Sequence, residues 1–115
     1  MDEKLAKALE FSNLMLTHQT QKNNLKEKFY SSIDFYYNGS KFLATPELIS
    51  FCTSLLYLDQ ESAVLIDSND LPCRVEDLRS FTSDLVDCFK QASNRYINDY
   101  NDIKIKKSIL DIIND

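Results

Sequence analysis

The sequence predicts an α+β fold in which long N-terminal and C-terminal amphipathic helices pack with a short middle helix and a small antiparallel sheet of two to three strands. Three observations support this fold class. The chain of 115 residues contains one Gly and two Pro, which favours long uninterrupted elements. Apolar residues recur at spacings of three and four in both terminal segments. A short apolar run followed by an Asp-rich turn lies between them. We expect residues 1–115 to form a single domain.

The first predicted helix starts near residue 2 and extends to about residue 38, a segment without Gly or Pro. Its apolar stripe comprises Ala8, Phe11, Met15, Leu25, Phe29, Ser32 or Ile33, and Tyr36. Residues 29–44 also fit a β-hairpin, because their apolar residues alternate and Asn38-Gly39 is a strong turn signal. We favour the helix, because the residues before Phe29 continue its phase and the return strand from Ser40 to Ala44 is short.

The middle of the chain predicts a strand over residues 41–44 and then a helix. Thr45 is expected to be the N-cap and Pro46 the first helical residue, where its missing N–H costs nothing. This helix should end near Leu58-Asp59. Its apolar residues cover much of its circumference, which predicts a central place in the core. They are Leu48, Ile49, Cys52, Leu55, Leu56 and Phe51.

A hairpin and the last long helix follow. The apolar run 63–66, the polar residues 67–70 and the segment 71–75 predict strand, turn and strand, with Pro72 at an edge or a bulge. Glu76 and Asp77 place negative charge in the first turn of the last helix, and Ser108 is expected to cap a short final helix. The last long helix carries a coiled-coil-like stripe of Leu78, Phe81, Leu85, Cys88 or Phe89, Ala92, Tyr96, Tyr100 and Ile103.

Charge and cysteine content restrict the class of protein. The net charge is −5, which disfavours unspecific binding to nucleic acid or to anionic lipid. Lys104, Lys106 and Lys107 form a local basic group that we interpret as cations near a helix C-terminus. The three cysteines have no CxxC spacing and are expected to be reduced and buried. Since the chain also lacks a secretory signal and a membrane-spanning apolar stretch, we expect a cytoplasmic protein that does not bind membranes.

The residues predict no catalytic, cofactor-binding or metal-binding site. His18 is the single histidine, and its sequence neighbours provide no carboxylate at helical spacing. Residues 67–70 suggest calcium, but the EF-hand pattern would need Gly and Glu where Pro72 and Leu78 stand. With one Gly, a P-loop or Rossmann phosphate loop is excluded. We therefore expect that the protein is not an enzyme and carries no cofactor.

Aromatic residues mark the predicted interaction surface. The residues expected at an interface are Phe29, Tyr30, Tyr36, Tyr37, Tyr96 and Tyr100. Together with the two long apolar stripes, they predict a non-enzymatic interaction or assembly protein that forms a homo-oligomer and whose other protein partner is unknown. The alternative is an accessory factor of nucleic-acid metabolism that binds DNA or a replication or recombination protein.

Several segments resemble a known group of proteins. They are AKALEFSN, LKEKF, FYYNGSKF followed by TPELISF, AVLIDSNDLPCRVEDL and ASNRYINDY. Together they look like small uncharacterised proteins encoded by T4-like phages of marine cyanobacteria and other ocean bacteria. The resemblance covers nearly the whole chain and implies expression in the cytoplasm of an infected bacterium, but it transfers no activity and no functional residue.

Overall fold

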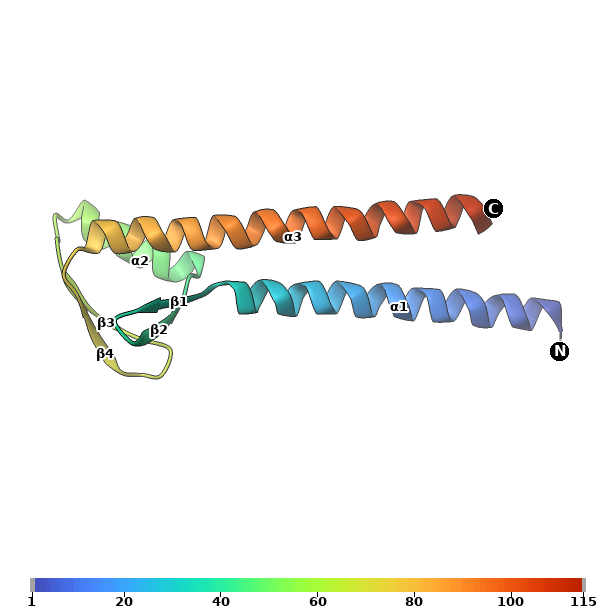
Figure 1. The fold of residues 1–115 in the computed structure, drawn as a ribbon, viewed down its shortest axis with the longest axis horizontal. Coiled ribbons are helices and arrows are strands. Elements are labelled where there is room, and N and C mark those ends of the chain that lie inside the picture. Colours follow the sequence, from blue (N-terminus) through green and yellow to red (C-terminus); the bar gives the residue numbers. More distant parts are fainter. Residues whose placement is uncertain (1, 115) are drawn as a thin grey trace. The chain divides into compact units, whose positions relative to one another are not determined.

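The computed structural model describes residues 2–114, with side chains from residue 2 to residue 106, and it confirms the α+β fold. Its elements are α1 (Glu3–Ser32), β1 (Asp34–Tyr37), β2 (Ser40–Leu43), α2 (Pro46–Tyr57), β3 (Ala63–Ile66), β4 (Pro72–Val75) and α3 (Leu78–Asn114), as Figure 1 shows. Residue contacts divide the chain into two compact units. The first contains α1 up to Phe29 and α3 from Arg95, and the second contains residues 30–94. The single-domain organisation stays a prediction.

The first unit is a pair of antiparallel helices, and its two ribbons run side by side in Figure 1. The ring centres of Phe29 and Tyr96 are 5.1 Å apart. Lys22 places its Nζ 5.9 Å from the ring centre of Tyr100. Earlier residues of α1 thus meet later residues of α3, so the two helices run antiparallel within this unit.

The segment after α1 is a β-hairpin, so the favoured prediction of a helix up to residue 38 is wrong. β1 and β2 pair antiparallel, with Phe35 opposite Phe42 and Tyr37 opposite Ser40. The two turn residues have positive φ angles, 48° at Asn38 and 81° at Gly39. Such a turn matches the twist of the flanking strands. The return strand is long enough because β1 itself has four residues.

The core of the second unit is centred on Phe81 of α3, which is 2% exposed. Three aromatic rings of the first hairpin meet it edge to face. Their centres lie 5.5 Å (Phe35), 5.2 Å (Tyr37) and 5.2 Å (Phe42) from the centre of the Phe81 ring. Alternation along β1 places Phe35 and Tyr37 on one side of the strand, and a helix would have separated them. The burial of these aromatic rings explains why the strand replaces the helix here.

α2 begins as predicted but does not occupy the centre of the core. The hydroxyl of Thr45 accepts a hydrogen bond from the backbone N–H of Leu48 at 3.2 Å, and Pro46 is the first helical residue. Cys52 is buried, whereas Phe51 is 53% and Leu58 is 65% exposed. The prediction of a central helix is therefore wrong. The apolar side of α3 fills the centre, so α2 covers the core with one side only.

The second hairpin has the predicted turn. The carboxylate of Asp67 is buried and accepts hydrogen bonds from the backbone N–H groups of Asn69 and Leu71, at 2.8 and 2.9 Å. This confirms that the polar loop bonds to its own backbone. Pro72 lies opposite Ile66 in a sheet of two strands, where every strand is an edge.

α3 confirms its predicted apolar stripe, whose members from Leu78 to Ile103 are buried or half-buried. Asp77 precedes the helix and caps it, because its carboxylate accepts a hydrogen bond from the backbone N–H of Ser80 at 3.0 Å. The prediction that Glu76 and Asp77 lie within the first turn is thus wrong by one or two residues. α3 continues without a break to Asn114, so the separate final helix is also wrong. The side chains of Lys107 and Ser108 lie outside the described residues.

Candidate functional site

The six predicted interface residues have different places in the fold. Phe29, Tyr96 and Tyr100 contribute to the helix pair of the first unit. Tyr37 packs on Phe81 inside the second unit. The remaining two tyrosines are largely exposed, with Tyr30 at 56% and Tyr36 at 68%. Ring contacts within the chain thus involve Phe29, Tyr37, Tyr96 and Tyr100, and the use of any of the six residues by a partner stays a prediction.

Exposed leucines of the first unit gather on α1, among the residues whose side chains the structure describes. None of the described residues of α1 is buried. Leu5, Leu9 and Leu16 are 53%, 47% and 64% exposed, and Ser12 between them is exposed as well. We call these four residues the outer face of α1. Three exposed leucines within four turns of one helix are an unusual concentration for a surface in contact with water.

The outer face lies almost opposite the side of α1 that contacts α3. On that inner side Lys22 and Phe29 contact α3, and the half-buried residues Leu14, His18 and Leu25 lie on the same side of the helix. At 100° per residue, its midpoint is about 150° around the helix from the midpoint of the outer face. The helix pair therefore does not cover the outer face. The predicted stripe is correct at Leu25 and Phe29, but it is wrong at Ala8, Phe11 and Met15, which are exposed.

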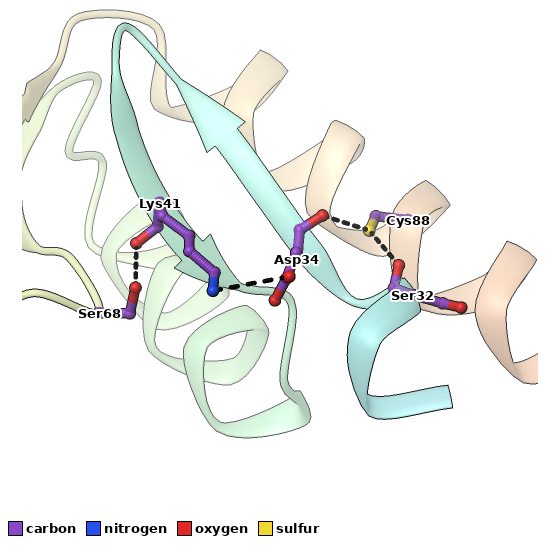
Figure 2. Close-up of polar contacts among 5 residues, drawn as sticks. All are labelled: Ser32, Asp34, Lys41, Ser68 and Cys88. Atoms are coloured by element: carbon purple, nitrogen blue, oxygen red, sulfur yellow. Dashed lines mark hydrogen bonds and ion pairs between the residues drawn. The ribbon is translucent and has the colours of Figure 1, made fainter. Parts of the chain in front are cut away.

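A polar junction in the second unit joins strands, loop and helix (Figure 2). The thiol of Cys88 lies 3.6 Å from the carbonyl oxygen of Ser32 and 3.9 Å from that of Asp34. It therefore donates to backbone carbonyls at the end of α1 and the start of β1. The Nζ of Lys41 lies 3.6 Å from the carboxylate of Asp34. The backbone N–H and the hydroxyl of Ser68 both donate to the carbonyl of Lys41, at 2.8 and 2.7 Å. These contacts hold the two hairpins and α3 together. The polar groups of Asp34, Lys41, Ser68 and Cys88 therefore have a structural role.

The cysteines agree with their predicted reduced state, since all three are free thiols. Cys52 and Cys73 are buried, and Cys88 is half-buried. Burial raises the pKa of the Cys52 thiol, and a hydrogen bond with the side chain of Thr82 offsets part of that rise. Cys52 is thereby held as a neutral thiol, which is the poorly reactive form.

A cleft of about 490 Å³ in the second unit lies between the end of α2 and the start of α3. Its lining is mostly acidic or polar and comprises Leu56, Asp59, Gln60, Glu61, Glu76, Asp77 and Arg79. Asp77 is engaged as the helix cap, and the carbonyl of Glu61 accepts a hydrogen bond from the backbone N–H of Leu78 at 2.9 Å. The acidic side chains here thus surround a helix start, where negative charge is favourable.

The described residues contain neither a metal-binding cluster nor a membrane-spanning helix. Among the described residues, no group of three or more His, Cys, Asp or Glu side chains could hold a metal ion. Within that range no helix combines the length and the apolar character needed to cross a bilayer. Lys104 and Lys106 are exposed on α3, and the alternative of a DNA-binding accessory factor stays a prediction.

No protein-family model, curated protein or solved structure matches the chain. The resemblance to proteins of T4-like marine phages therefore stays a prediction.

The sequence interpretation missed the outer face because it followed one stripe along the whole of α1. Leu5, Leu9, Ser12 and Leu16 are spaced four, three and four residues apart. That spacing is the signature of a second apolar stripe, limited to the first half of the helix.

Proposed function

We propose that this protein is a non-enzymatic interaction or assembly protein that works as a homo-oligomer, and that its long helices form the contact between copies. The observation that supports this function is the exposure of Leu5, Leu9 and Leu16 on a helix none of whose described residues is buried. Helical stability in proteins comes mainly from the packing of an apolar side. A 30-residue helix with so little buried surface gains stability when another helix covers its exposed leucines.

Oligomeric state in solution tests this function. Size-exclusion chromatography with light scattering should give at least twice the mass of one chain at about 100 µM, and the mass should fall on dilution as the association equilibrium shifts. A mass of one chain throughout would contradict the proposal. The helical signal in circular dichroism should decrease on dilution in parallel with the mass, because the exposed leucines of α1 then lose their contact with the second copy.

A further inference from the structure

We infer that the partner of the outer face is the same face of a second copy, packed antiparallel across a two-fold axis between residues 10 and 11. This inference rests on the proposed function, since it names the surface and the geometry of the oligomer. It follows from the order of residues on the outer face, from the position of the charges around it and from the sequence that continues α1.

The order of residues makes the outer face its own complement. Spacings of four, three and four place Leu5, Leu9, Ser12 and Leu16 at the d, a, d and a positions of a heptad repeat. When the second helix runs in the opposite direction, Leu5 meets Leu16 of the second copy and Leu9 meets Ser12 of the second copy. The large Leu9 thus faces a small residue, and every layer occurs twice, as a two-fold axis requires.

Between Leu5 and Leu16 no residue of the contact is charged. The flanking e and g positions hold Ala6, Ala8, Asn13 and Met15. The charged residues of this segment, Glu3, Lys4, Lys7 and Glu10, all fall at b, c or f positions, outside the contact. Charged e and g residues normally select a different partner helix. An uncharged border does not discriminate against a second copy, and it allows two identical helices to approach without like-charge repulsion.

The continuation of α1 decides between antiparallel and parallel pairing. The same heptad places Asp2 at a, Gln19 at d, Asn23 at a and Lys26 at d. In a parallel pair each of these residues would face its own copy, so that Lys26 would meet Lys26 of the second copy inside the contact. In the antiparallel pair the overlap is limited to about residues 2–19, which is about 27 Å of helix. Lys26 then lies outside the overlap, and Asp2 meets Gln19 of the second copy.

The test uses two single variants of the full chain and their mixture. Leu5→Lys and Leu16→Glu each place a charge in the contact, so each should weaken self-association at least about 100-fold. Both positions are more than half exposed in one chain, at 53% and 64%, so the helix itself should form. Helical circular dichroism at high concentration checks this for each variant.

Mixing the two variants tests the register. In the antiparallel pair the introduced lysine at position 5 faces the introduced glutamate at position 16, and the other layer regains Leu16 against Leu5. The mixture should therefore form a one-to-one dimer within about tenfold of the wild-type affinity. In a parallel pair, position 5 faces position 5 of the second copy, so each introduced charge would face a leucine and the mixture would not regain affinity. Glu10→Lys, a charge change at a b position beside the axis, is the matched control and should dimerise like the wild type.

The outcomes distinguish a failure of the antiparallel contact from a failure of the proposed homo-oligomer. A wild-type protein that is monomeric at all concentrations overturns both. A wild-type oligomer that survives Leu5→Lys and Leu16→Glu overturns the inference and leaves the proposed function standing. If each variant alone is monomeric but their mixture does not associate, the outer face is the contact, but the antiparallel register is wrong.

Discussion

Replacing Phe81 measures how strongly the aromatic core stabilises the second unit. Phe81 is 2% exposed and meets three aromatic rings at centre distances of 5.2 to 5.5 Å. A buried Phe→Ala change costs about 3–5 kcal/mol, because apolar burial is lost and a cavity remains. Each edge-to-face pair contributes about 0.5–1.5 kcal/mol beyond burial. We therefore expect Phe81→Ala to reduce the free energy of unfolding by about 4 kcal/mol.

The variant Phe81→Leu separates ring contacts from burial. Leucine keeps much of the apolar volume but provides no ring edge for Phe35, Tyr37 and Phe42. The expected loss is about 2 kcal/mol, which lies between the value for one ring pair and the cost of a full cavity.

Urea unfolding followed by circular dichroism at 222 nm gives these free energies, provided that the slope with urea is the same for each variant. The matched control is Phe51→Ala, because Phe51 also lies on a helix of the second unit but is 53% exposed. Its cost should be about 1 kcal/mol or less. If Phe81→Ala costs no more than Phe51→Ala, the core is not organised around Phe81 and the reasoning from its ring contacts is refuted.

Substitutions at three further positions test the turns and the buried thiol. Asp67→Ala should cost about 2–3 kcal/mol, because it removes the acceptor for two backbone N–H groups, whereas Asp67→Asn keeps an oxygen and should cost less. Gly39→Ala should cost about 1 kcal/mol, because φ is +81° although no atom lies within 4 Å of an added Cβ. The raised pKa of Cys52 predicts that stability falls as the pH rises above about 8.5, where the unfolded thiol starts to lose its proton while the folded thiol keeps it. Cys52→Ala should remove that part of the pH dependence.

Urea unfolding measures all of these changes, and each has an outcome that would contradict it. Equal costs for Asp67→Ala and Asp67→Asn would mean that the acceptor oxygen does not stabilise the turn. A stabilising Gly39→Ala would show that the hairpin turn does not need the left-handed conformation. A stability that stays constant from pH 8 to pH 10 would contradict a buried neutral thiol at Cys52.

Local chemistry explains which parts of the fold could be predicted from sequence. Thr45-Pro46 and Asp67 act through neighbours three or four residues away, so their roles follow from the sequence alone. The α3 stripe was predictable because one period holds from Leu78 to Ile103.

The errors occur where distant residues decide the outcome. Residues 34–37 fit both a helix and a strand, and the strand prevails because Phe35 and Tyr37 reach Phe81, more than forty positions along the chain. α2 is apolar on most sides, but its burial depends on how much of the core α3 already fills. The outer face was missed because the first half of α1 carries apolar residues on more than one side. Contacts with α3 show which of these sides remains uncovered.

Burial is uneven along α3, so the free energy of local opening should differ between its two parts. Up to Ala92 most of the stripe of α3 is buried, at Leu78, Phe81, Leu85 and Ala92. Beyond it, Tyr96, Tyr100 and Ile103 are all half-buried. Amide hydrogen exchange depends on the free energy of local opening, which falls where packing is sparse. We therefore expect slow exchange in α3 as far as about Ala92 and faster exchange beyond Arg95, although the helix is continuous. One uninterrupted helix would then open in two stages.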